Sequence, residues 1–260
     1  MIISELTDEA KKELAGYLRL PNFTADVNCP YFNNRRIRLR GALRVLVGKG
    51  SPEEISEEAK LFALREKIDL TALTNDALKK FLVGHRLGTD CSGFAYHLLE
   101  AEGLGKKLGN LKKHLHRPFI QNPLRKFLVW LRPIENTGVG TFSHETNSHE
   151  IKIEDIRAGD LIIMLKTGPK RDYNHVMVIT SVEGESGSPN TIHYAHSFQW
   201  SKDGQYDHGV RTGRIEITDI KKPLLEAVWV EKNATGDNNE TYTHAKNAEV
   251  LVLKRLNWFK

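Results

Sequence analysis

One of the two cysteines of this chain, Cys91, stands where a loop is expected to become a helix. Either Thr89 or Asp90 can cap that helix, because a short side-chain oxygen at this position accepts from unpaired N–H groups of the first turn. Apolar residues then recur at helical spacing, namely Phe94, Leu98 and Leu99. A thiol in the first turn lies at the positive end of the helix dipole, which favours the thiolate, the form that attacks carbonyl carbons. Cys91 is therefore a candidate nucleophile.

A thiol becomes a catalyst when an imidazole takes its proton and a third polar group orients that imidazole. Of the eleven histidines, His175 is the best placed, because it begins the strand-like run 176–180 after a turn-like segment. His193 and His196 lie on the next expected strand, where their spacing puts them on opposite faces. Only one of the two can support His175, and the spacing alone leaves the choice open.

The first half of the chain shows helical patterns. Helices are expected over 5–19, 35–48 and 51–66, and another from Thr74 onward. The 51–66 helix has the clearest start, because Ser51 can cap it, a proline fits its first turn and Glu54 can complete a capping box.

After residue 150 the pattern changes to β-branched runs bounded by Gly, Pro, Asn and Asp, which is typical of strands. The expected strands are 161–165, 176–180, 192–197, 214–218, 227–230 and 250–253. Residues 183–190 are expected to form a hairpin loop, and the polar segment 233–248 an exposed excursion. Helices followed by strands predict an α+β fold rather than an alternating α/β fold.

Four short blocks occur in order along the chain. They are Asp90-Cys91-Ser92-Gly93-Phe94, Gly159-Asp160-Leu161-Ile162, His175-Val176-Met177-Val178-Ile179 and Tyr194-Ala195-His196-Ser197. The ordered set resembles the NlpC/P60 family of papain-like cysteine peptidases, over about residues 84–200. The resemblance implies a papain-like core, in which a nucleophile helix packs on an antiparallel sheet, with an N-terminal helical region and insertions added. CHAP domains share the cysteine-then-histidine order and remain a neighbouring alternative.

The resemblance also implies roles for individual residues. Cys91 would be the nucleophile, His175 the general base and acid, and His196 the orienting residue, with His193 as the alternative third residue. The backbone N–H of Cys91 would contribute to an oxyanion hole. Asp160 would have a structural role in a turn. The side chains expected to line the site are Tyr31, Asp90 and Ser92.

The chain departs from the family pattern by being longer around the cysteine. We expect a helical N-terminal region over 1–75 and an NlpC/P60-like catalytic domain over 76–260, with a basic insertion at 105–150. Tyr31 stands far upstream of Cys91 for a tyrosine that lines the site. If it has that role, residues 35–80 are a second, helical insertion.

Charge and composition narrow the range of partners. The formal net charge is +5, and the segment 105–132 contains eight Lys and Arg residues and no acidic residue. Such a segment can attract an anionic partner, although no motif for a specific nucleic acid accompanies it. Scattered histidines with two distant cysteines do not make a metal-binding spacing, so we expect no metal and no cofactor.

The two cysteines, Cys29 and Cys91, are too few for a disulfide framework. No signal-peptide pattern and no apolar run of membrane-spanning length are seen, which favours a cytoplasmic location unless the chain is exported by another route.

These observations predict a cysteine peptidase or amidase that hydrolyses an amide bond through an acyl-enzyme. The resemblance points to peptidoglycan-type peptides or muropeptides, and γ-glutamyl peptides would also fit. Two alternatives remain: a thiol acyltransferase or amidase with a non-peptide substrate, and a non-catalytic module that binds an anionic partner.

Overall fold

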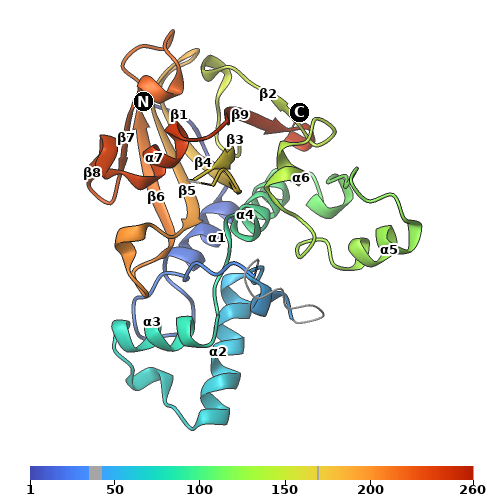
Figure 1. The fold of residues 1–260 in the computed structure, drawn as a ribbon, viewed down its shortest axis with the longest axis vertical. Helices are drawn as coiled ribbons and strands as arrows, with labels where there is room; N and C mark the ends of the chain where they lie inside the picture. The colour runs from blue at the N-terminus through green and yellow to red at the C-terminus, as the bar shows by residue number, and fades with distance from the viewer. Residues whose placement is uncertain (35–42, 169, 260) are drawn as a thin grey trace.

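The computed structural model describes residues 1–34, 43–168 and 170–259. Within these residues the fold is α+β, with helices packed against a large antiparallel sheet (Figure 1). The helices are α1 (Asp8–Leu18), α2 (Pro52–Glu66), α3 (Asn75–Gly84), α4 (Cys91–Gly105), α5 (Pro123–Leu131), α6 (Val139–Ser143) and α7 (Glu240–Lys246). The α+β class expected from the sequence is confirmed.

The sheet contains nine strands in the described part of the chain. They are β1 (Ile2–Glu5), β2 (Ser148–Glu150), β3 (Leu161–Thr167), β4 (Tyr173–Glu185), β5 (Ser188–Phe198), β6 (Gly209–Glu216), β7 (Val228–Glu231), β8 (Ala234–Thr235) and β9 (Val250–Leu256). Their order is β2-β9-β3-β4-β5-β6-β7-β8, and β1 pairs with β4. Strands β4 to β7 are consecutive neighbours, so residues on them are brought together by simple hairpin connections.

The sheet buries apolar side chains on both faces. Along β3, Leu161 and Ile163 belong to the apolar cluster that includes α1 and α4, whereas Ile162 and Met164 belong to the cluster on the other face. This follows from the alternation of side chains along a strand. Helix α4 is central to the first cluster, and truncating its fully buried Leu98 to alanine would cost about 2–5 kcal/mol. The core therefore fixes α4 firmly against the sheet.

Local capping explains where the helices begin. Ser51 and Glu54 form the expected capping box at the start of α2. Thr74 caps α3, and Asp90 caps α4 by accepting from the Gly93 N–H. These helix starts are visible in the sequence because a cap depends on residues three positions apart.

Other sequence expectations need correction. The hairpin loop expected over 183–190 is largely paired strand, because β4 and β5 extend to Glu185 and Ser188. The segment 233–248 is not simply an exposed excursion: it contains α7, whose Thr241 and Ala245 are buried. Of the helix expected over 35–48, residues 35–42 lie outside the described residues, and Arg44–Val47 form a short 3₁₀ helix.

The segment 105–150, which the sequence analysis expects to be a basic insertion, contains its own secondary structure. Helices α5 and α6 and strand β2 lie within it, and α5 lies at the periphery, away from the sheet (Figure 1). None of the described helices is long and apolar enough to cross a membrane.

Candidate active site

Cys91 is the first residue of α4, and its side chain is almost enclosed, with 9% of the residue exposed. Two adjoining strands contact this end of the helix. The Ser197 hydroxyl of β5 donates to the Thr89 carbonyl at 2.7 Å, and the backbone N–H of Val176 in β4 is close enough to act to lower the pKa of Cys91. Val176 belongs to the same apolar cluster as α4, whereas His175 pairs in register with Met164 of the cluster on the other face. No hydrogen bond joins the Cys91 sulfur to His175 in the described part of the chain.

The pairing between β4 and β5 does not extend along the whole of the two strands. The paired ladder between β4 and β5 runs from their hairpin as far as Val178 and Ala195. Beyond that pair, β5 continues along β6 while the start of α4 contacts β4 and β5. The Cys91 end of the helix thus lies near the part of β4 and β5 where the two strands are no longer paired.

Burial changes the expected charge of the thiol. Burial, with a smaller contribution from the neighbouring Asp90 carboxylate, raises the pKa of Cys91 to about 12. Lys49 and the N–H groups of Val176 and Ser92 act in the opposite direction but do not outweigh burial. The expectation that the helix start favours a thiolate is therefore not met: with this raised pKa the thiol is protonated near neutral pH.

A buried ionic cluster stabilises the first turn of α4, beside Cys91. Lys49 Nζ donates to Asp90 Oδ1 at 2.8 Å, to Ser92 Oγ at 2.6 Å and to the Thr137 carbonyl at 3.1 Å. All three side chains are buried. Asp90 and Ser92 thus form part of the support for the first turn of α4, and Thr137 links that turn to the basic insertion.

His175 and His196 form a buried hydrogen-bonded pair. His175 Nε2 lies 2.7 Å from His196 Nδ1, and His196 Nε2 lies 3.1 Å from Glu231 Oε2. Tyr194 donates its hydroxyl to the same Glu231 oxygen at 2.8 Å. The three residues His175, His196 and Glu231 come from β4, β5 and β7, so the sheet itself sets their order.

The charge of Glu231 determines which ring nitrogens carry protons. Burial acts to raise the pKa of Glu231, but His196, Arg211 and the hydrogen bonds outweigh it and leave that pKa below its usual value. An ionised carboxylate only accepts, so His196 Nε2 carries a proton and its neutral Nδ1 accepts from His175 Nε2. Nδ1 of His175 is then unprotonated and is the nitrogen that can act as a base.

Burial also keeps His175 uncharged. It lowers the pKa of His175 well below the usual value, and His196, His244 and Arg211 contribute in the same direction. The resting site is therefore a neutral thiol and a neutral imidazole rather than an ion pair.

His193 occupies a different environment. It pairs in register with Ser181, several residues along β4 from His175, and its Nε2 bonds to Glu183 at 2.8 Å. The side chain is about one-third exposed. Of the two alternatives for the third position, the structure places His196 and not His193 beside His175.

Tyr31 reaches the same region from the N-terminal part of the chain. It forms an isolated backbone bridge with Thr89, and its N–H donates to His208 Nδ1 at 3.1 Å. Burial raises the pKa of its hydroxyl, with Cys91 and Asp90 adding to the effect, and Asn33 donates to that hydroxyl. The structure therefore puts Tyr31 in the neighbourhood of Cys91 despite the long sequence separation.

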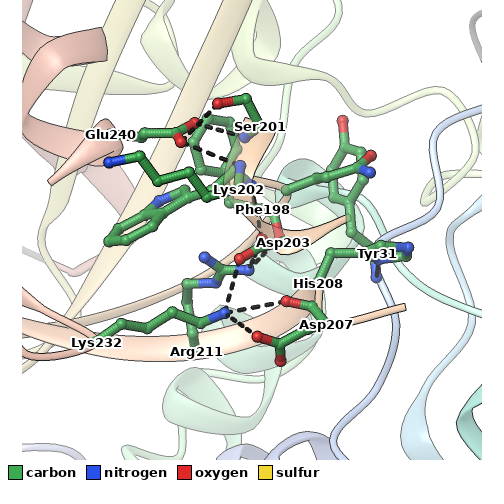
Figure 2. A network of polar contacts seen from close by, with 12 residues as sticks. Tyr31, Phe198, Ser201, Lys202, Asp203, Asp207, His208, Arg211, Lys232 and Glu240 are labelled. Carbon is green, nitrogen blue, oxygen red and sulfur yellow. Dashed lines mark hydrogen bonds and ion pairs between the residues drawn. The ribbon is translucent and has the colours of Figure 1, made fainter. Parts of the chain in front are cut away.

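A polar network around Arg211, drawn in Figure 2, lies next to Glu231. Arg211 donates to Asp203 and to the Phe198 carbonyl, and its Nη1 lies 3.7 Å from Glu231 Oε1. Lys232 makes ion pairs with Asp203 at 2.7 Å and Asp207 at 3.1 Å. Figure 2 shows this network continuing toward His208 and Tyr31.

Sequence reasoning missed Glu231, Lys49 and Arg211. Glu231 follows the expected strand 227–230 directly, and an acidic residue at the end of a buried strand was the available signal. Lys49 and Arg211 carry no comparable local signal, because their partners lie in distant segments.

Comparison of the chain with protein-family models, curated proteins and solved structures found no match. In the described part of the chain, no three His, Cys, Asp or Glu residues gather in a way that could hold a metal ion. The chemistry of the site is thus assigned from the side chains themselves.

Proposed function

We propose that this protein is a cysteine hydrolase that cleaves an amide bond through an acyl-enzyme, with a papain-like core of the NlpC/P60 type. The observation that carries the proposal is the hydrogen-bonded chain His175–His196–Glu231, which begins on the two strands that α4 contacts. Nucleophile, base, orienting group and carboxylate are the parts that a thiol hydrolase needs.

In the proposed first half-reaction, the thiol and base act together. His175 Nδ1 takes the Cys91 proton as sulfur attacks the substrate carbonyl carbon, because a thiol with a pKa of about 12 is not ionised beforehand. The resulting imidazolium is stabilised through His196 by the charge of Glu231. It then gives the proton to the leaving nitrogen, the C–N bond breaks and an amine departs, leaving a thioester on Cys91.

The second half-reaction consumes water. His175 takes a proton from the attacking water, the C–S bond breaks, and the proton returns to the Cys91 sulfur while the carboxylic acid leaves. During both steps the negative charge on the carbonyl oxygen is stabilised by backbone N–H groups at the start of α4, including that of Cys91.

For the substrate we propose a peptide of the peptidoglycan or γ-glutamyl type. This choice rests on the NlpC/P60 resemblance of the four sequence blocks. The enclosed position of Cys91 favours a slender, extended acyl group over a bulky globular substrate.

The test is incubation of the full chain with muropeptides and γ-glutamyl peptides, followed by mass spectrometry. We expect a product pair that differs from the substrate by one water, and no product with Cys91→Ala. His193→Ala is the matched control and should retain activity. A new amide or ester formed with an added acceptor, with no hydrolysis, would indicate acyl transfer instead. Intact substrates of both types with wild-type protein would contradict the substrate proposal, and the absence of any acyl adduct on Cys91 would contradict the mechanism.

A further inference from the structure

Helix α5 has its apolar side turned outward. Its five large apolar residues are each more than half exposed, namely Leu124, Phe127, Leu128, Trp130 and Leu131. The buried member of the helix is Val129, which is 4% exposed. With 3.6 residues per turn, Val129 lies roughly opposite Phe127. The helix is therefore attached through its narrow side and presents its wide apolar face to the surroundings.

Basic residues border this apolar face. Arg125 and Lys126 are exposed on the same helix and lie on either side of Val129, away from the centre of the apolar face. The flanking chain adds Lys112, Lys113 and Arg117, and the whole of 105–132 contains no acidic residue. An outward apolar face with aromatic residues and a basic border is the pattern of a helix that lies in a membrane interface.

A hollow beside α5 adds a place for anionic groups. It has a volume of about 500 Å³, and its lining includes Lys112, Arg117, Lys126 and Trp130. Arg117 is held by neutral oxygens, since it donates to the carbonyls of Leu115 and Pro133 and to the Thr137 hydroxyl. Among the described residues its Nε has no hydrogen-bond partner. In the described part of the chain no carboxylate forms an ion pair with Arg117, so its positive charge is not neutralised by a partner within the protein.

We propose that α5 and its basic border dock the protein on an anionic lipid surface, with the apolar face at the boundary between headgroups and acyl chains. Two observations select this occupant. A second copy of the chain would bring two strongly basic segments together, which is unfavourable. A nucleic acid would contact the basic side chains of the segment but would leave the five exposed apolar side chains of α5 uncovered.

Docking by α5 would also place the catalytic region in a defined relation to the membrane. Thr137 accepts from Arg117 through its hydroxyl and from Lys49 through its carbonyl, and Lys49 in turn holds Asp90 and Ser92 beside Cys91. The base of the insertion is thus tied to the start of α4. The proposal does not depend on the hydrolase activity, and Cys91→Ala should bind lipid as the wild-type protein does.

The experiment is flotation of the full chain with vesicles of phosphatidylcholine alone and vesicles that also contain phosphatidylglycerol. We expect at least about tenfold stronger binding to the anionic vesicles, decreasing with salt, because each basic residue near such a surface contributes roughly fivefold. Trp130 fluorescence should shift to the blue on binding, and Trp130→Phe should abolish most of that shift.

Two surface variants separate the apolar and charged contributions. Leu124→Ser/Leu128→Ser and Arg125→Glu/Lys126→Glu should each reduce binding about tenfold or more while leaving the melting temperature unchanged, since all four residues are exposed. The matched control is Leu61→Ser/Leu64→Ser, which removes two exposed leucines from the acidic helix α2 and should not alter binding.

Three results would overturn the proposal. The first is equal binding to neutral and anionic vesicles, or none to either. The second is anionic-vesicle binding that Leu124→Ser/Leu128→Ser leaves intact. The third is concentration-dependent self-association that this variant abolishes, with no vesicle binding by the wild-type protein, which would assign the face to a second copy.

Discussion

Nε2 of His175 and Nδ1 of His196 lie 2.7 Å apart in the interior of the sheet, and both residues are buried. The ionised Glu231 on the far side of His196 sets the direction of this hydrogen bond, because it accepts from His196 Nε2 at 3.1 Å. Glu231, on β7, thereby determines which nitrogen of His175, on β4, is free to act as a base. His196 and Glu231 are both buried, so water does not compete for the hydrogen bonds that orient His175.

Removal of His196 should abolish most of the activity. His196→Ala leaves His175 Nε2 without its partner and uncouples it from Glu231, so we expect kcat to fall roughly a hundredfold or more. His193→Ala removes the other histidine of the same strand and should change kcat less than about twofold, because the His193 ring is partly exposed and bonds to the exposed Glu183. Steady-state kinetics of the two variants provide the comparison. Equal losses would contradict the assignment of His196.

The charge of Asp90 should restrain the nucleophile. Asp90→Asn keeps an oxygen that can cap the Gly93 N–H but removes a negative charge that raises the pKa of Cys91. If that pKa falls by about one unit, the thiolate fraction rises about tenfold. Its lower intrinsic nucleophilicity reduces the gain in alkylation rate to roughly threefold. The rate of iodoacetamide labelling of Cys91 at pH 8 measures this, with Cys29 in the same molecule as the control. A slower rate in Asp90→Asn would show that Asp90 promotes ionisation instead.

Lys49 should contribute to stability as well as to the site. Its ammonium group is almost fully enclosed and pairs with Asp90, so Lys49→Met leaves a buried carboxylate without its cation. Breaking such a pair costs about 3 kcal/mol. In the double variant Lys49→Met/Asp90→Asn the loss should be smaller than the sum of the single losses, because no unpaired charge is left. Urea unfolding of the four proteins tests the coupling, and strictly additive losses would show that the pair contributes nothing.

Buried His175 should make the protein sensitive to acid. Its pKa in the folded state is well below the unfolded value of about 6.5, so below that pH the unfolded chain takes up a proton that the folded protein excludes. The associated stability is fully present above about pH 6.5 and is lost as the pH falls toward the folded pKa. Unfolding free energies measured between pH 7.5 and 5 should decrease less steeply in His175→Asn than in wild-type protein. A steeper decrease in the variant would contradict the direction of the shift.

Local features of the fold could be predicted from the sequence. Asp90 caps the helix that contains the apolar residues after Cys91, and each β-branched run forms a single strand. Both kinds of element can be predicted because they depend on residues close together in the sequence. The His175–His196 contact was one of two alternatives, because alternation along a strand excludes the simultaneous use of His193 and His196. The choice between them needed the actual pairing of β4 with β5.

What the sequence could not predict depends on long-range packing. Glu231 lies near the histidines because β7 is next to β6, which is next to β5 in the sheet. Lys49 bonds to Asp90, which is 41 residues away in the sequence. The protonation of Cys91 was predicted wrongly for a related reason. The helix dipole is a local property, whereas the burial that raises the pKa to about 12 is a property of the assembled core.

In the proposed mechanism, His175 activates an otherwise protonated Cys91. Cys29 provides an internal reference, because it is also buried, its pKa is likewise raised to about 12 by burial, and its sulfur donates only to the Pro30 carbonyl. Iodoacetamide labelling of both cysteines should therefore be followed by mass spectrometry across the neutral pH range, in wild-type protein and in His175→Ala.

We expect Cys91 in the wild-type protein to react at least about tenfold faster than Cys29, and we expect His175→Ala to remove this advantage without changing the Cys29 rate. Equally slow labelling of the two cysteines, or a fast Cys91 reaction that persists in His175→Ala, would contradict it.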